Sequence, residues 1–324
     1  MDKVNVSGAR TTLRWTAKSM EERVVRYADL RPCYNAFIDT RTPGSEAKEN
    51  FTIIGPGVSE NPEQHVHIAE SHGFNIGGAR QPPACVNSQH SHETAEVFVV
   101  HSGTWRFDLG EHGDDAQVML NPGDVISIPT GMFRGFTNIG ADVGYLFAVL
   151  GGDDPGRVLW APHVFDMAAQ YGLVLLENGQ LIDTAAGQTL PRDAGKMPRT
   201  SPDQVAALRR PSPEEAESLV WRAPIDATAI ATPIIGEHAL LSWPHPFTLE
   251  RLDLRGDQVL EARVTAPEVL FAQSGCLTVE WADGALVLGE GDTMTVPVGL
   301  DRTLSGSCTA YRVSGSATTG SIPH

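Results

Sequence analysis

The chain has 324 residues and a formal net charge of −16 at pH 7, with 41% hydrophobic and 20% charged residues, 32 glycines and 22 prolines. So large a negative charge argues against binding nucleic acid or an anionic membrane through a general electrostatic surface. No segment approaches membrane-spanning length, and the first residues lack the apolar core of a signal peptide, so we expect a cytoplasmic protein. The glycine and proline content suits many short strands and turns, so we expect a mainly β protein.

The four cysteines are Cys33, Cys85, Cys276 and Cys308. They are scattered along the chain without the short spacing of a metal-binding motif. We therefore expect free thiols in a reducing compartment.

Residues 1–50 are expected to form an arm with a short helix. The segment Ser19-Met20-Glu21-Glu22 has the pattern of a capping box, and the helix must end before Pro32. Strand-like segments follow, and one of them carries His65 and His67. No carboxylate stands at a matching offset, so we interpret this pair as part of an ordinary strand face in preference to a contribution to a site.

Residues 84–138 carry the side chains with the clearest chemistry. His90 and His92 are two apart, so on a β-strand both imidazoles lie on one face, and Glu96 has the same parity. Two imidazoles and a carboxylate that converge form the facial arrangement that holds Fe(II) and similar divalent ions with open positions. Taken by itself, the triplet would favour a chance pattern in a surface loop over a metal site. His101 has the opposite parity to Glu96, and we expect it to face solvent.

The flanking residues extend this triplet into a longer pattern. The pattern consists of His90, His92, Glu96, Gly103, Gly123, Pro129 and Gly131. In order and spacing it resembles the two motifs of the cupin superfamily. The resemblance implies a small double-stranded β-helix, or jelly-roll barrel, with one divalent metal held in its mouth by the two histidines and the glutamate. We expect this metal-bearing barrel, called barrel 1, to span residues 51–160.

Two positions depart from the cupin pattern. Ala84 stands where the family usually has a glycine, and Arg134 stands where the second motif usually supplies a third histidine, while Asn138 is kept. Arg134 has two interpretations. It either pairs with Glu96 and competes with a cation, or it serves as a catalytic residue that binds the substrate through its forked guanidinium. The apolar walls of the substrate site are expected to come from Phe98, Met132 and Phe136.

Residues 161–235 differ in character and are expected to form a helical linker. A short helix is expected from Pro162 to a glycine stop at Gly172. Ser201 and Ser212 are each followed by a proline and, at the third position, by Gln or Glu, which predicts two further capped helices.

Residues 236–324 repeat the pattern of barrel 1, which predicts a second barrel, barrel 2, and a bicupin as the whole. The matching positions are Gly256, Glu268, Gly275, Gly291, Pro297 and Gly299. Ala262 and Val264 occupy the positions of the two histidines, so we expect barrel 2 to hold no metal. Glu268 and Arg302 remain, and we expect them to form a buried structural pair, because a carboxylate inside a barrel is costly unless it is paired.

The resemblance also implies a range of functions. Bicupins with one metal-bearing and one degenerate barrel resemble the non-haem dioxygenases, and we expect an oxygen-using enzyme acting on a small anionic substrate of aromatic or dicarbonyl type. Iron(II) is the favoured metal, with zinc, nickel and manganese as alternatives. A non-catalytic ligand-binding bicupin and a metal-dependent isomerase or lyase that does not use oxygen remain open. By the same resemblance we expect the chain to form a homodimer. We also expect it to bind a small-molecule substrate.

Overall fold

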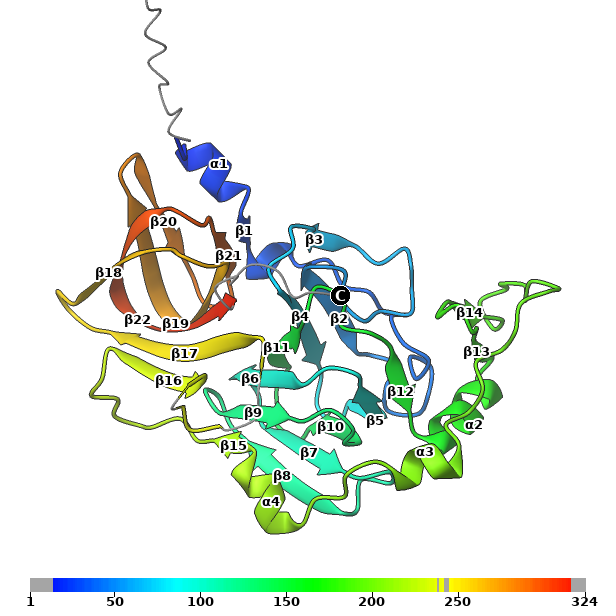
Figure 1. Cartoon of the computed structure of the whole chain (residues 1–324). Coiled ribbons are helices and arrows are strands. Elements are labelled where there is room, and N and C mark those ends of the chain that lie inside the picture. The colour runs from blue at the N-terminus through cyan, green and yellow to red at the C-terminus, as the bar shows by residue number, and fades with distance from the viewer. Residues whose placement is uncertain (1–13, 238, 242–244, 316–324) are drawn as a thin grey trace, which may run out of the picture.

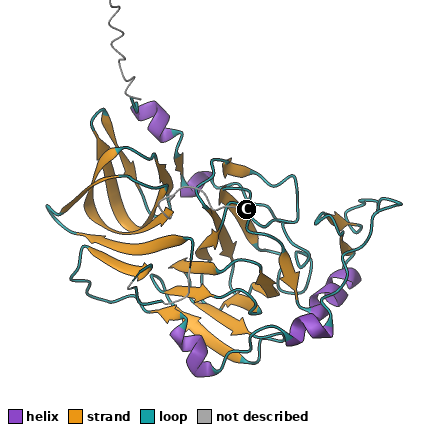
Figure 2. Ribbon diagram, viewed as in Figure 1, coloured by secondary structure: helices purple, strands orange, loops and turns teal. Residues whose placement is uncertain are grey.

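The computed structural model describes residues 14–237, 239–241 and 245–315. Two β-barrels lie side by side, with barrel 2, built from the C-terminal strands, packed against barrel 1 (Figure 1). Helices are few and short, and they lie at the periphery of the strands (Figure 2). The mainly β fold with two barrels joined by a partly helical segment is therefore confirmed.

Barrel 1 is formed by two sheets that face each other. The seven-stranded sheet has the order β15 (Val220–Trp221), β9 (Val125–Ile128), β6 (Glu96–Ser102), β11 (Gly144–Gly151), β4 (Phe74–Gln81), β2 (Glu49–Ile54) and β3 (Val66–Ile68). The five-stranded sheet has the order β12 (Val158–Trp160), β5 (Val86–His92), β10 (Arg134–Asn138), β7 (Trp105–Leu109) and β8 (Ala116–Leu120). The short strand β15 of the linker thus extends a sheet of barrel 1.

Barrel 2 is one sheet of eight strands. Its main path is β1 (Val24–Val25), β21 (Thr293–Val296), β19 (Glu268–Trp281), β22 (Asp301–Gly315), β17 (Phe247–Leu254) and β16 (Ala231–Ile235). Two further strands join it, β18 (Val259–Arg263) on β22 and β20 (Gly284–Leu288) on β19. Because β1 lies in the N-terminal arm, the arm adds a strand to the barrel that is most distant from it in sequence.

The helices are α1 (Ala17–Glu21), η1 (Tyr27–Asp29), α2 (Pro162–Gln170), α3 (Pro202–Ala206) and α4 (Pro213–Ser218), and a hairpin of β13 (Leu173–Leu175) and β14 (Leu181–Asp183) follows α2. Ser201 closes a complete capping box on α3, and Ser212 caps α4. The expected cap at Ser19 is wrong. Thr16 caps α1 instead, because its hydroxyl accepts the amide hydrogen of Ser19 at 3.1 Å.

The alternation along β6 separates two hydrophobic cores. Phe98 and Val100 point into barrel 1, whereas Val97 and Val99 belong to the core between the barrels. At that interface the rings of Phe147 and Phe271 stack, with centroids 4.2 Å apart and planes at 18°. Apolar contact on both faces explains why β6 has four consecutive hydrophobic residues, Val97 to Val100, although it lies in an antiparallel sheet.

His101 does not face solvent as expected. Its parity does direct it away from the interior of barrel 1, but barrel 2 covers that side. Its ring lies 5.5 Å from the ring of Phe271 and 5.8 Å from that of Tyr145, measured between centroids. Parity alone indicates a face of the strand and does not show what covers it.

The turn before β5 shows why the family pattern has a glycine there. Ala84 has φ +63°, and it is the single non-glycine residue with positive φ in the described part of the chain. Gly256 stands at the matching position of barrel 2 and has φ +59°. Barrel 1 thus keeps the left-handed turn even though it lacks the residue that adopts it most readily.

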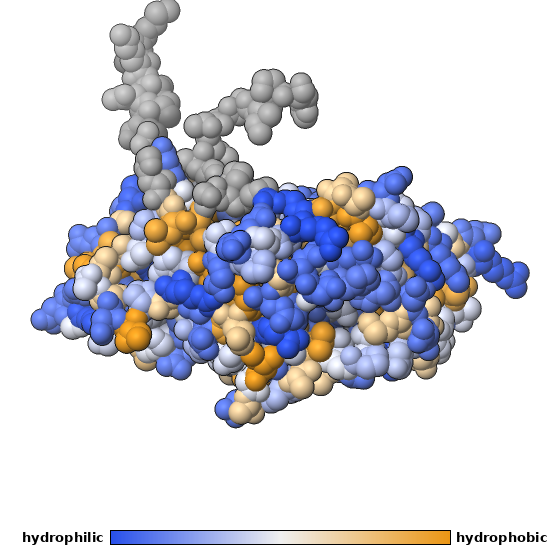
Figure 3. Space-filling model, turned by 90° about the horizontal axis from the view of Figure 1, so that it is seen from below, coloured by the Kyte–Doolittle hydropathy of each residue, from blue (hydrophilic) through white to orange (hydrophobic). Residues whose placement is uncertain are grey.

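The surface on the face shown in Figure 3 is largely hydrophilic, with hydrophobic residues in several separate patches. None of the described helices is long and apolar enough to cross a lipid bilayer. All four cysteines are free.

Candidate metal centre

Two adjacent segments bring the predicted metal ligands together inside barrel 1. His90 and His92 lie at the end of β5, and Glu96 is the first residue of β6, after a three-residue turn. Each offers a ligand atom within 4.8 Å of the others, and all three side chains are buried. His92 Nε2 lies 3.5 Å from Glu96 Oε2. The structure thus forms one cluster of two imidazoles and one carboxylate, which can hold a metal ion.

Both histidines are held in the form that a metal requires. Burial lowers the pKa of His90 and of His92 well below the ordinary value, and the nearby guanidinium of Arg134 lowers both further. A neutral imidazole keeps a lone pair for coordination. His90 Nδ1 lies 2.7 Å from the carbonyl oxygen of Ser88. Because a carbonyl only accepts, the proton of His90 sits on Nδ1 and its Nε2 remains available for a cation.

Arg134 lies behind Glu96 and is almost fully buried. Its Nη2 donates to Glu96 Oε2 at 2.5 Å, and its Nη1 donates to the carbonyl oxygen of His90 at 3.4 Å. Burial raises the pKa of Glu96, and the charge of Arg134 opposes that rise. The guanidinium contacts only one of the two carboxylate oxygens, so Oε1 of Glu96 remains for a cation. The donor set therefore fits a divalent ion with three protein ligands.

A pocket opens beside these three ligands, with a cavity volume of about 70 Å³. This space is large enough for several water molecules or a small ligand. Phe98 and Phe136 line it, as predicted. Met132 instead lies in the apolar core of barrel 1, and Arg134 is absent from the lining. The structure also adds Trp160, which the sequence did not single out.

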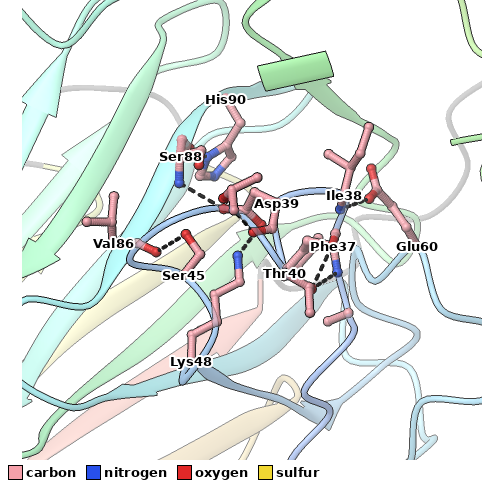
Figure 4. Close-up of polar contacts among 12 residues, drawn as sticks. Phe37, Ile38, Asp39, Thr40, Ser45, Lys48, Glu60, Val86, Ser88 and His90 are labelled. Carbon is pink, nitrogen blue, oxygen red and sulfur yellow. Dashed lines mark hydrogen bonds and ion pairs between the residues drawn. The ribbon is translucent and has the colours of Figure 1, made fainter. Parts of the chain in front are cut away.

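A polar network outside the barrel supports His90 (Figure 4). Asp39 and Lys48 form an ion pair in which both side chains are 0% exposed. The other oxygen of Asp39 accepts the amide hydrogen of Ser88 at 3.0 Å, and the carbonyl of Ser88 binds His90. A partner that fixes the tautomer and orientation of a ligating histidine is typical of metal sites. The N-terminal arm thus contributes to the site, which the sequence pattern did not indicate.

A second buried carboxylate lies behind Trp160. Glu60 accepts from Trp160 Nε1 at 2.6 Å and from the amide of Ile38 at 2.7 Å. Burial raises the pKa of Glu60 to about 8. Trp160 is opposite His90 in the sheet, and their ring centroids are 5.3 Å apart. Glu60 therefore fixes the indole that forms one wall of the pocket.

His65 and His67 lie apart from the metal cluster. His67 Nδ1 donates to the carbonyl oxygen of Thr52 at 2.7 Å, and its Nε2 accepts the amide hydrogen of Arg31 at 3.1 Å. Both nitrogens of His67 are engaged with the backbone, which agrees with the interpretation as an ordinary strand face.

Barrel 2 repeats the geometry without the histidines. Ala262 pairs with Arg302 across β18 and β22, just as His90 pairs with Arg134 across β5 and β10. Val264 is buried in the apolar core of barrel 2. Arg302 donates to both oxygens of Glu268, with each bond 2.8 Å long.

Comparison with known proteins agrees with this architecture. Residues 79–150 match the family model of the cupin domain. A search of curated proteins found no match. Among solved structures, procruciferin, an 11S globulin from Brassica napus, is 12% identical with a TM-score of 0.54, and the alignment covers 89% of this chain and 84% of that one.

Two further structures span nearly the whole chain. Protein Ylba from E. coli is 10% identical with a TM-score of 0.52, with 92% of each chain covered. A deletion mutant of the oxalate decarboxylase OxdC from Bacillus subtilis is 12% identical with a TM-score of 0.51, covering 91% of this chain and 77% of that one. At such identities the likeness concerns the fold, and a decarboxylase and a globulin share it, so the fold does not determine the activity. Residues 79–150 of barrel 1 therefore match a cupin domain, and the chain as a whole has the fold of two such barrels, a bicupin fold.

Proposed function

We propose that barrel 1 is the catalytic domain of a metal-dependent dioxygenase, and that iron(II) is its metal. The observation that carries the proposal is the convergence of His90, His92 and Glu96 at the wall of a pocket inside barrel 1. Three protein ligands leave up to three positions of an octahedral ion for substrate and dioxygen. When bound, the ion would supply the activation of oxygen that the side chains of the chain lack.

The substrate that fits this arrangement is small and binds the metal through anionic oxygens, as a phenolate or an enolate of a dicarbonyl compound does. Phe98, Phe136 and Trp160 form apolar walls that would hold a ring and exclude water from it. His90 is oriented before the substrate arrives, because the Ser88 carbonyl fixes it.

Arg134 takes a different role in this proposal from the one expected at first. Its described contacts are with Glu96 and with the backbone of His90, and direct substrate binding would require it to leave both. We propose that Arg134 is a positioning residue that holds Glu96 through Oε2, the oxygen that lies 3.5 Å from His92 Nε2, and leaves Oε1 without a hydrogen bond among the described contacts.

The test is oxygen uptake by protein loaded with Fe(II) under anaerobic conditions and then supplied with air-saturated substrate. The panel contains gentisate, hydroquinone, catechol, a flavonol and a β-diketone. We expect uptake with at least one compound, none with the apo protein, and none after His90→Ala. Turnover of a substrate by zinc-loaded protein without oxygen would instead favour an isomerase or lyase.

A non-catalytic bicupin is the second candidate, and one observation favours it. The glutamate–arginine pair of barrel 2, where the histidines are missing, recurs in barrel 1 as Glu96 and Arg134. If that pair is purely structural, the purified protein will bind less than a tenth of an equivalent of metal under every loading condition, and His90→Ala will not change that content.

A further inference from the structure

The wall of the barrel 1 pocket carries two carboxamides that bind nothing in the protein. Asn50 and Asn87 are each 5% exposed and line the pocket. Among the described contacts neither side chain has a hydrogen bond, and Asn50 Nδ2 and Asn87 Oδ1 are fully buried without a partner. Buried polar groups are nearly always hydrogen-bonded. Two unpaired amides in one pocket therefore indicate groups that serve a ligand.

The strands place these amides on two sides of the space beside the metal ligands. Asn87 lies on β5, and a bulge in that strand brings it to the same side as His90, since Arg134 and Phe136 of β10 pair with His90 and Asn87 respectively. Asn50 comes from β2 of the opposite sheet, where it pairs with Ala79. The two carboxamides thus line the pocket from its two opposing sheets.

Gln64 adds a third carboxamide to the same pocket, with an acceptor that has no partner. Its Nε2 donates to the hydroxyl of Thr52, which orients the side chain, and its buried Oε1 has no partner. Both Gln64 and Thr52 line the pocket. The wall therefore offers hydrogen-bond donors and acceptors together.

The charge of the lining restricts what those groups can bind. The described residues that line the pocket include no lysine and no arginine, and Glu96 is the one carboxylate among them. A substrate carboxylate buried away from the metal would have no cation to pair with, and an unpaired buried charge is far more costly than a neutral polar group. Neutral amides match a neutral group that both donates and accepts.

We propose that the substrate joins a metal-chelating head to an uncharged polar tail, a carboxamide or an equivalent neutral group, which Asn50 and Asn87 bind. The inference rests on the proposed metal site and goes beyond it by assigning the class of the tail. It also restricts negative charge on the substrate to the oxygens that contact the metal.

The test uses three catechols of nearly equal size on zinc-loaded protein, where no oxygen chemistry intervenes. The probes are 3,4-dihydroxybenzamide, 3,4-dihydroxybenzoate and 4-methylcatechol, and binding is measured by calorimetry. We expect the benzamide to bind at least about tenfold more tightly than the benzoate, because a site with paired polar groups discriminates strongly against a mismatched analogue. Equal or tighter binding of the benzoate overturns the inference, as does failure of all three probes to bind.

Asn50→Leu and Asn87→Leu identify the residues responsible. Each should remove most of the preference for the benzamide and leave 4-methylcatechol binding equal or tighter. Neither should lower the melting temperature of the apo protein, because no protein hydrogen bond is lost. Asn138→Leu is the matched control, since this buried amide makes three hydrogen bonds to the backbone and its loss should lower the melting temperature by several degrees. Retention of the benzamide preference in both pocket variants overturns the assignment.

Failure of this inference is separable from failure of the proposed function. Oxygen uptake by iron-loaded protein with benzoate-type and benzamide-type catechols at equal efficiency would leave the dioxygenase standing and overturn the neutral tail. Selective binding of the benzamide by a protein that never consumes oxygen would support the neutral tail and remove the dioxygenase.

Discussion

Barrel 1 and barrel 2 carry the same buried glutamate–arginine pair in two different states. In barrel 2, Arg302 donates to both oxygens of Glu268. In barrel 1, Arg134 donates to a single oxygen of Glu96, and its Nε has no hydrogen-bond partner. A carboxylate bonded at both oxygens has little to offer a cation, whereas one bonded at a single oxygen still has a free ligand atom. One side-chain pair thus fits a structural role in one barrel and a ligand site in the other.

The residues opposite the arginine account for the difference. His90 and His92 face the pair in barrel 1, whereas Ala262 and Val264 occupy the same register in barrel 2, where Val264 packs into an apolar core. Histidines need polar partners when buried, and a metal can supply one. Apolar residues need no polar partner, so in barrel 2 the Glu268–Arg302 pair can be enclosed by apolar packing without a metal.

The largest effect is expected when the two histidines of barrel 1 are replaced by the residues at the matching positions of barrel 2. In His90→Ala with His92→Val, two of the three ligands are lost, and we expect metal content by elemental analysis to fall from about one ion per chain to background. The apo protein should remain folded, since buried polar groups are replaced by apolar ones of no greater size. Ala262→Ser is the matched control in barrel 2 and should leave the content unchanged. Near-stoichiometric metal in the double variant would contradict the assigned ligands.

The next largest effect is expected from removing the arginine of barrel 2. Arg302→Met leaves Glu268 buried without a counter-charge, and we expect the free energy of unfolding to fall by about 3–5 kcal/mol. Metal content should not change. Urea unfolding with elemental analysis on the same sample measures both. A variant as stable as the parent would show that the pair does not support barrel 2.

The matched change in barrel 1 should behave differently. Arg134→Met also leaves a carboxylate unpaired, but there a divalent cation can replace the guanidinium. We expect stability to be lost in the apo protein and partly restored at saturating metal, with metal affinity lowered about tenfold or more because Glu96 is no longer held in position. Tighter metal binding in this variant would mean that Arg134 competes with the ion and does not position Glu96.

The sequence predicted what depends on local pattern. The spacing of His90 and His92 placed both imidazoles on one face of a strand, as strand periodicity requires. The inclusion of Glu96 and the location of barrel 2 came from the resemblance to the cupin motifs and from their repeat along the chain. Phe98 and Phe136 shared that parity and do line the pocket.

What the sequence did not predict depends on contacts between distant segments. Asp39 reaches Ser88 across 49 positions, and Trp160 reaches Glu60 across 100, and no local spacing indicates either contact. Met132 was expected to form an apolar wall of the substrate site, yet it packs into the barrel core. These residues are positioned by tertiary packing, which the periodicity of a strand does not predict.

Glu60 supplies a test of this unpredicted support around barrel 1. Its pKa is about 8 in the folded protein against an ordinary 4.5, so between these values the folded state holds a proton that the unfolded state releases. The stability it contributes is therefore present below pH 4.5 and falls as pH rises, by up to about 1.4 kcal/mol for each pH unit, until about pH 8. Glu60→Gln should remove this slope from a pH series of urea unfolding curves. Glu63→Gln, at an exposed neighbouring position, should keep it, and an unchanged slope in Glu60→Gln would contradict the raised pKa.

The smallest effect concerns the turn that differs between the barrels, where Ala84 and Gly256 hold the same left-handed conformation at φ +63° and +59°. A residue with a Cβ pays roughly 1–2 kcal/mol for this conformation, while glycine loses about 0.5–1 kcal/mol more in backbone entropy on folding. Ala84→Gly should therefore stabilise the protein by about 0.5–1 kcal/mol, and Gly256→Ala should destabilise it by a similar amount. An added Cβ at Gly256 meets no atom within 4 Å, so the conformation alone sets the cost there. Urea unfolding of the two single variants and of the double variant measures these terms, and the double variant should match the parent. If Ala84→Gly instead lowers stability, the methyl group of Ala84 contributes packing that outweighs the strain of its turn.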